Sequence, residues 1–269
     1  LSDIILEMRG VTKRFPGVLA LDNVSIQLRK GEVHAICGEN GAGKSTLMKV
    51  LSGSYVSNMY EGEIWFEGQH IHPMNVKVAR DLGIEMIYQE VNAMLDGNIA
   101  ENLYVGNLPG KGIFVNYKKL FSDTAEVLKK LDIQVDPKSP ARPLNSGQLQ
   151  LLSIMRAVIR NPKILVLDEP TSALTDNETE KLFEIIETLK SNGVSCVYIS
   201  HKLDEIFRIA DRVTVMRDGS IVSCKPISEC TKESLVEEMV GRKIENMYPA
   251  DVKKPSAEVV LKIEELSVP

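Results

Sequence analysis

The chain has 269 residues, of which 43% are apolar and 12 are proline. This composition supports a buried core in one large or two small domains and excludes a disordered or fibrous protein. No apolar run approaches the roughly 18 to 20 residues that span a bilayer, so we expect a soluble chain without a secretion signal. The formal charge of −5, with no extended basic cluster, argues against a nucleic-acid partner. The four cysteines form no CxxC pair, which favours reduced thiols without zinc.

The first 70 residues are typical of a small antiparallel sheet. Val24, Ile26 and Leu28 alternate with polar residues, as in a strand with one buried face. The segment Gly62 to Gly68 is a short apolar strand between glycines. We therefore expect an antiparallel β-subdomain beside the main sheet.

Short apolar runs alternate with helical patterns from about residue 33 onward, which predicts a parallel sheet with crossover helices. Three of these runs, Val33 to Cys37, Ile164 to Leu167 and Val194 to Ser200, each lead into polar residues. Ligands bind at the carboxyl ends of strands in open α/β sheets, so we expect the functional site there. His34 lies inside a strand without motif support and is interpreted as structural.

Between Glu90 and Gln150 no strand is expected, and apolar residues at helical spacing predict a mostly helical insertion. Thr175 to Glu178 forms a capping box that predicts the start of a long helix. A later pair of apolar runs predicts a hairpin that turns at Asp218 and Gly219.

The segment Gly38 to Thr46 fits the phosphate-binding pattern G-x-x-x-x-G-K-[ST] and lies between an apolar strand and a helix. Glycines let backbone N–H groups approach phosphate oxygens, and the helix that begins near Lys44 directs its positive end toward them. Lys44 is expected to reach the β- and γ-phosphates of ATP, and the Ser45 hydroxyl to ligate Mg²⁺. The predicted nucleotide ligands of this loop are Gly38, Glu39, Asn40, Gly41, Ala42, Gly43, Lys44, Ser45 and Thr46.

A second buried strand ends in two adjacent carboxylates, Asp168 and Glu169. Alone, such a pattern is more often a strand end with a solvated acid. After a complete phosphate loop, it predicts that Asp168 holds the Mg²⁺ shell and that Glu169 polarises an attacking water.

Six motifs, in this order along residues 4 to 240, resemble those of the ATP-binding cassette (ABC) ATPases. They are the phosphate loop, Gln89 in IYQE, Leu144 to Gln148 (LNSGQ), ILVLDEP, Ser172 to Asp176 (SALTD), and Ser200 with His201. The resemblance implies an α/β fold with a P-loop NTPase, RecA-like core in residues 1–241. It also implies an antiparallel β-subdomain and a helical subdomain at about 91–160 that carries the LNSGQ signature.

The resemblance further implies a role for individual residues. Phe15 would stack on adenine, although an ordinary core position stays open for it. Gln89 would join Ser45 and Asp168 at Mg²⁺ and link the metal to the transmembrane partner. Glu169 would act as the base and His201 would contact the γ-phosphate, with a structural histidine as the alternative. The signature residues would serve the nucleotide of the opposite domain in a head-to-tail dimer; these are Ser146, Gly147 and Gln148.

The amino-acid sequences of several segments, such as FPGVLALDNVS and YEGEIWFEG, are similar to those of the ATPase subunits of bacterial monosaccharide importers. This likeness implies integral-membrane permease subunits and, indirectly, a solute-binding protein as partners, at the cytoplasmic face of the membrane. Nucleoside importers stay open as an alternative. Non-transport ABC ATPases and a module that binds nucleotide without hydrolysis also stay open. The expected markers of repair or translation factors, namely sustained heptads, paired CxxC motifs and basic blocks, are missing from the sequence.

Two further features of the sequence, an atypical signature and a C-terminal repeat, lead to separate expectations. In the signature, Asn145 and Ser146 stand where the family usually has Ser and Gly, so the site that this signature completes is expected to hydrolyse slowly. Residues 259–269 repeat the pattern of Ile4 to Lys13, after a polar stretch with two prolines at 242–258. We therefore expect a linker followed by the start of a second cassette in the same chain.

Overall fold

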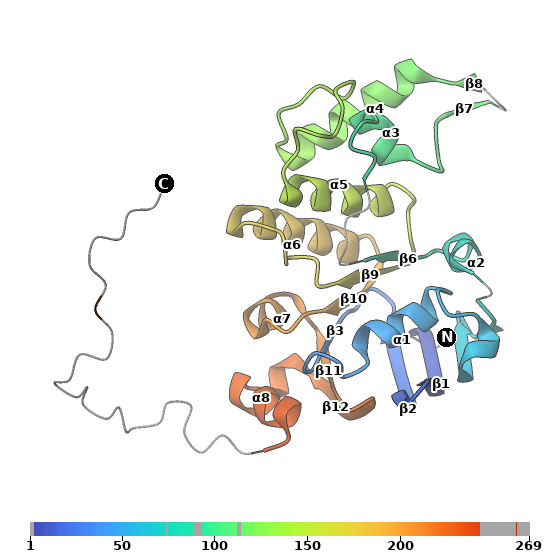
Figure 1. Cartoon of the computed structure of the whole chain (residues 1–269), viewed down its shortest axis with the longest axis vertical. Helices are drawn as coiled ribbons and strands as arrows, with labels where there is room; N and C mark the ends of the chain where they lie inside the picture. The colour runs from blue at the N-terminus through green and yellow to red at the C-terminus, as the bar shows by residue number, and fades with distance from the viewer. Residues whose placement is uncertain (1–2, 74, 89–92, 112–113, 243–261, 263–269) are drawn as a thin grey trace.

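The computed structural model describes residues 3–73, 75–88, 93–111, 114–242 and 262, and Figure 1 shows their arrangement. Over those ranges, a six-stranded sheet has the order β12-β11-β3-β10-β9-β6. Its strands are β3 (Val33–Cys37), β6 (Ile84–Ile87), β9 (Ile164–Asp168), β10 (Ser195–Ile199), β11 (Arg212–Arg217) and β12 (Ser220–Pro226). The pairings are parallel except that β12 is antiparallel to β11. The predicted parallel core is thus confirmed.

The central strands are apolar because both faces of the sheet are covered. Along β9, Leu165 and Leu167 pack with the helices α5 (Ser146–Val158) and α6 (Asp176–Ser191). The alternate residues of the same strand pack on the opposite face with α1 (Lys44–Leu51) and with the second sheet. A continuous apolar run is the expected pattern for a strand buried on both sides.

The second sheet is antiparallel, as predicted, with the order β2-β1-β4-β5. Its strands are β1 (Ile4–Phe15), β2 (Val18–Arg29), β4 (Glu61–Phe66) and β5 (Gln69–Ile71). One face of this sheet packs on α1 in the same apolar cluster as the core strands. This packing places the beginning of β2 beside the loop that follows β3, since residues of both border one cavity.

A helical segment lies beyond α5, drawn in green in Figure 1. It contains α3 (Ile99–Tyr104) and α4 (Tyr117–Leu131), whose buried residues have helical spacing. The expectation that no strand occurs between Glu90 and Gln150 is wrong for β7 (Gly110–Lys111) and β8 (Phe114–Val115). These strands have two residues each, so they are too short to produce an alternating pattern in the sequence.

The remaining helices connect the strands and close the carboxyl end of the described region. They are η1 (Ser57–Met59), α2 (Val76–Asp81), α7 (Leu203–Ile209), η2 (Ile227–Glu229) and α8 (Lys232–Val240). None of the helices in the described ranges is long and apolar enough to cross a bilayer. The predicted linker at 242–258 and second-domain start at 259–269 lie outside the described residues, apart from Arg242 and Lys262.

Two local predictions are confirmed in detail. Thr175 caps α6 by accepting a hydrogen bond from the Glu178 amide, and the Glu178 carboxylate accepts one from the Thr175 amide. The hairpin of β11 and β12 turns at Asp218 and Gly219, with φ of 49° and 77°. Both positive values match the turn that two-residue hairpins prefer.

His34 is a core residue, with 1% of its surface exposed. Its Nδ1 donates to the Gln27 carbonyl oxygen at 3.1 Å, and Nε2 accepts from the Thr214 hydroxyl at 2.7 Å. Burial, together with the charges of Arg212 and Arg29, lowers its pKa to about 3 and outweighs the Gln27 hydrogen bond. The structural interpretation of His34 is therefore confirmed.

The depressed pKa of His34 predicts acid sensitivity of the fold. The unfolded chain takes up a proton near pH 6.5 and the native chain only near pH 3, so His34 contributes stability at neutral pH that is lost as the pH falls between these values. The loss is about 1.4 kcal/mol per pH unit. Urea unfolding at pH 6.5, 5.5 and 4.5 measures it. The variant His34→Gln should show a shallower pH dependence than the wild type, and an equal slope would contradict the assignment.

Candidate functional site

The loop between β3 and α1 needs glycine at two positions because other backbone lies against it. At Gly38, with φ of 156°, an added Cβ would lie 2.1 Å from the Met216 carbonyl oxygen. At Gly43, with φ of 98°, it would lie 2.6 Å from the carbonyl oxygen of Ala20. A Cβ cannot approach backbone so closely. The glycines of the motif are therefore required by close packing as well as by ligand access.

Lys44 begins α1, and its ammonium group lies over the loop. Nζ donates to the carbonyl oxygens of Gly38 at 2.8 Å and Glu39 at 2.9 Å. The side chain is largely buried, and burial lowers its pKa, against the opposing effect of Glu169 and Asp168. The loop thus holds a desolvated positive charge at the beginning of a helix, an arrangement suited to anionic phosphate.

Ser45 and Asp168 are 123 residues apart in sequence and meet at the carboxyl edge of the sheet. The Ser45 hydroxyl donates to Asp168 Oδ1 at 3.2 Å, and burial raises the pKa of this carboxyl. In the described ranges no three His, Cys, Asp or Glu side chains gather as a metal site. A hydroxyl and one carboxylate nevertheless suit Mg²⁺, which commonly takes its other ligands from waters and substrate phosphates.

Glu169 and His201 follow neighbouring strands, β9 and β10, and their side chains are in contact. His201 Nδ1 lies 3.1 Å from Glu169 Oε1. Glu169 has a left-handed backbone, with φ of 47°, and its amide donates to the Ile199 carbonyl oxygen at 3.0 Å. Such a conformation is uncommon for a residue with a side chain and is frequent at functional sites.

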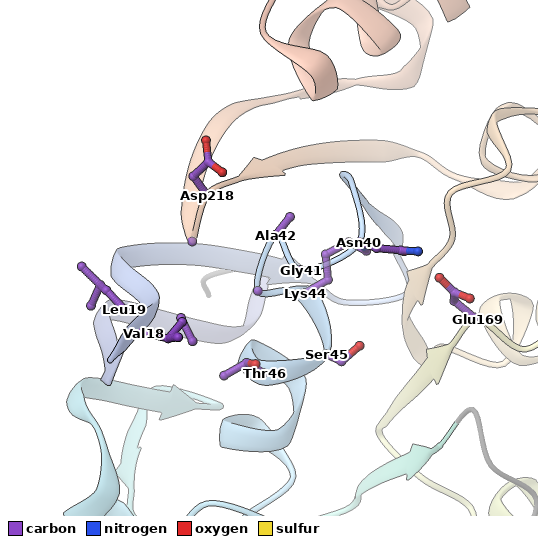
Figure 2. A pocket seen from close by; sticks show the side chains of 13 residues that line it. Val18, Leu19, Asn40, Gly41, Ala42, Lys44, Ser45, Thr46, Glu169 and Asp218 are labelled. Carbon is purple, nitrogen blue, oxygen red and sulfur yellow. The ribbon is translucent and has the colours of Figure 1, made fainter. Parts of the chain in front are cut away.

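Lys44, Ser45 and Glu169 border a cavity of about 570 Å³ that Figure 2 shows from close by, whereas Asp168 and His201 are not among its lining residues. Val18 and Leu19 lie on one side of the loop and Glu169 on the other. The lining residues are Val18, Leu19, Ala20, Asn40, Gly41, Ala42, Gly43, Lys44, Ser45, Thr46, Glu169, Asp218 and Gly219. The structure therefore brings most of the predicted loop together with Glu169 around one space.

The same cavity includes residues that the motifs did not identify, from the beginning of β2 and from the β11–β12 hairpin. The Gly219 amide donates to the Ala42 carbonyl oxygen at 3.2 Å, which joins the hairpin to the loop. Phe15 is not among the lining residues. Its half-buried ring packs edge-on against Tyr55 at 5.6 Å, with Lys13 Nζ 4.7 Å from its centroid. Gln89 lies outside the described residues.

A family model described as ABC transporter matches residues 21–172, which is more than half of the chain. The chain belongs to the ABC transporter family. A solved ATP-binding cassette of an ABC transporter, in its ADP conformation, is 28% identical with a TM-score of 0.76. The match covers 90% of this chain and 100% of that one. The predicted α/β P-loop fold, with an antiparallel sheet and a helical segment, is thus confirmed for this ABC family member.

Two curated ABC relatives carry names that mention sugars. The xylose import ATP-binding protein of Geobacillus kaustophilus is 44% identical, over 100% of this chain and 53% of that protein. The galactose/methyl galactoside import ATP-binding protein of Photobacterium profundum is 47% identical, over 100% and 54%. The chain thus spans about half the length of the curated relatives it matches.

The predicted signature residues Ser146, Gly147 and Gln148 form the first turn of α5 and do not line the cavity. Asn145 is the N-cap of this helix: its side-chain oxygen accepts from the Gln148 amide at 2.7 Å. Gln148 Oε1 in turn accepts from the Asn145 amide at 3.2 Å. The presence of asparagine at position 145 is therefore explained locally, because Asn is among the most favourable residues at a helix N-cap.

Proposed function

We propose that this chain binds ATP with Mg²⁺ in the cavity at the carboxyl edge of the sheet, and that it hydrolyses ATP within a complete transporter. The observation that carries this proposal is the convergence of Lys44, the Ser45–Asp168 pair and the Glu169–His201 pair at that edge. Phosphoryl transfer to water depends on charge neutralisation and on positioning of the water. Lys44 supplies the positive charge, and the Glu169–His201 pair is suited to position the water.

The chain's own residues divide the work between binding and chemistry. Lys44 and the amides of the phosphate loop neutralise and orient the phosphates. Mg²⁺, when bound, neutralises phosphate oxygens, and Ser45, Asp168 and Gln89 are the residues proposed to hold it. Glu169 accepts a proton from, or orients, the attacking water, while His201 contacts both Glu169 and the transferred phosphate. We retain Phe15 as the proposed adenine contact.

We infer that the transported solute is a monosaccharide, because the relatives that match the whole chain are named for xylose and galactose import. The ATPase would act as a peripheral subunit on the cytoplasmic face of the membrane, below a permease that receives sugar from a solute-binding protein. The test uses the reconstituted importer and measures hydrolysis with different loaded binding proteins. Stimulation by a sugar-loaded protein is expected; stimulation only by a nucleoside-loaded protein would contradict the inference.

A second cavity, of about 340 Å³, supports contact with an acidic side chain of a permease. Its lining includes Arg80, Arg156, Arg160 and the buried Glu85. Glu85 Oε1 accepts from Arg80 at 3.0 Å and from Arg160 at 3.1 Å, so the one carboxylate serves two guanidinium groups. Among the described residues, Arg156 donates to the Ser153 hydroxyl at 3.1 Å; burial and the charges of Arg160 and Arg80 lower its pKa and outweigh the opposing effect of Glu85. A partner carboxylate would satisfy this charge.

Substitution of Arg156 tests the permease contact. In Arg156→Gln we expect assembly with the permease to weaken by about 10-fold or more, because a carboxylate of the partner loses its charged donor. Co-purification and titration of the permease in detergent measure assembly. Nucleotide affinity should not change, since α1 and its loop are intact. The exposed Arg208→Gln is the control; equal assembly of both variants with the permease would exclude the contact.

We also infer that the chain forms the first of two cassettes in one polypeptide. The repeat at 259–269 and the half-length match to the curated relatives support this arrangement. A short linker would give the two cassettes a high effective concentration, and the signature of this cassette would then complete the other cassette's site. The 269-residue chain alone should be monomeric without nucleotide in light scattering. A stable dimer under these conditions would contradict the arrangement.

A further inference from the structure

Glu205, at the third position of α7, is a buried carboxylate that the mechanism above does not use. Only 7% of its surface is exposed. Oε2 accepts from the Tyr198 hydroxyl at 2.7 Å and from the Ser200 hydroxyl at 3.0 Å. Oε1 accepts from the Thr171 hydroxyl at 2.7 Å and lies 3.1 Å from Lys202 Nζ. Four donors from three different segments therefore converge on one side chain.

The donors lie close in the sequence to Glu169 and to His201, the two residues of the proposed catalytic pair. Thr171 comes two residues after Glu169, in the loop between β9 and α6. Ser200 and Lys202 are the direct neighbours of His201, and the Ser200 hydroxyl accepts from the Lys202 amide at 3.0 Å. This bond closes a turn across His201. Glu205 thus ties the loop of the proposed base to the turn of the proposed phosphate contact.

A second link joins the same two loops without Glu205. Lys202 Nζ donates to the Thr171 hydroxyl at 3.2 Å, so these residues and the carboxylate form a closed ring of polar contacts. Burial acts to raise the pKa of Glu205, but the hydrogen bonds from Thr171, Tyr198, Lys202 and Ser200 outweigh it and lower the pKa. A fully satisfied buried network of this kind restricts the positions of the groups it holds.

We propose that Glu205 is a positioning residue for ATP hydrolysis: it fixes the loop of Glu169 against the turn of His201, so that the contact between these two side chains is maintained. The inference rests on the proposed hydrolytic function. It also explains why a carboxylate is buried close to a site that must bind an anion. The four donors compensate the negative charge of the Glu205 carboxylate. The side chain does not border the cavity, since Glu205 is not a lining residue.

The test compares Glu205→Gln with Glu32→Gln in the complete importer. Glu32 is an equally buried carboxylate at the opposite end of the same sheet, where it accepts from the Arg29 amide and from Arg212. We expect kcat, counted per nucleotide-binding site, to fall about 10-fold in Glu205→Gln because small misplacements of reacting groups are costly. KM for ATP should stay within about twofold, because the binding loop is intact. Glu32→Gln should keep both values.

Thr171→Val provides a second measurement that does not depend on the folding of Glu205→Gln. It removes one donor and keeps the shape of the side chain, so kcat should fall several-fold without loss of bound nucleotide. Wild-type kcat in Thr171→Val, or equal kcat in the two glutamine variants, would overturn the positioning role. If the wild-type importer neither binds nor hydrolyses ATP, the proposed function itself is wrong, which is a separate result.

Discussion

Replacing Glu169 with Gln should lower steady-state ATP hydrolysis by about 100-fold or more in the complete importer. Gln keeps the size of the side chain and can still accept a hydrogen bond from His201, but it cannot take a proton from water. Nucleotide should still bind, because Lys44 and the loop amides are unchanged. The variant should therefore accumulate in a nucleotide-loaded state, which trapping of labelled ATP would detect.

The control for this experiment is Glu180→Gln, at an exposed position on α6. It removes a carboxylate from the same region of the sequence without touching the cavity, so its turnover should equal that of the wild type. Wild-type turnover in the Glu169 variant would remove this residue from the mechanism. Loss of nucleotide binding in that variant would instead assign Glu169 to binding.

Lys44→Ala should reduce the affinity for ATP by about 100-fold, which corresponds to about 3 kcal/mol for the loss of a charged donor to phosphate. The ammonium group is already desolvated and held by two carbonyl oxygens, so its transfer to phosphate oxygens needs little reorganisation. Titration of the chain with a fluorescent ATP analogue measures the dissociation constant.

The exposed Lys30→Ala is the matched control, because Lys30 precedes β3 and so lies at the end of that strand opposite the phosphate loop. Its dissociation constant should equal that of the wild type. Because a change in ionic strength alters the affinity of any anion, both titrations are performed at the same salt concentration. Equal binding by Lys44→Ala and the control would contradict the phosphate role of the loop.

The sequence predicted the core because its determinants are local. Apolar runs of five residues specify strands buried on both faces, and the spacing of Gly38, Gly43 and Lys44 specifies a loop between strand and helix. The carboxyl ends of parallel strands necessarily share an edge, so the meeting of Ser45 with Asp168 follows from the strand assignment. The contact between Glu169 and His201 follows in the same way, because β9 and β10 are neighbours.

Other features depend on how distant segments pack and have no local signal. The Asp-Gly pair predicted a hairpin, but nothing near it indicated that Gly219 would contact the phosphate loop. Val18 and Leu19 resemble ordinary strand residues, yet they form one wall of the cavity. The polar contacts of Glu205 likewise require Thr171, in the loop after β9, and Tyr198, on β10, to reach the same carboxylate. Sequence spacing cannot indicate such a meeting before the register is known.

The cavity combines residues 18–20, 40–46, 169 and 218–219, which are separated by almost the whole length of the described chain. No partly folded intermediate that lacks the last hairpin can contain the complete site. On the proposed function, ATP would therefore shift the folding equilibrium toward the native state, since a ligand that binds only the native state stabilises it. At a ligand concentration of about 100 times the dissociation constant this gain is about 2.7 kcal/mol. On the proposed function, depletion of ATP in the cell would remove the substrate of the ATPase and part of the stability of its fold.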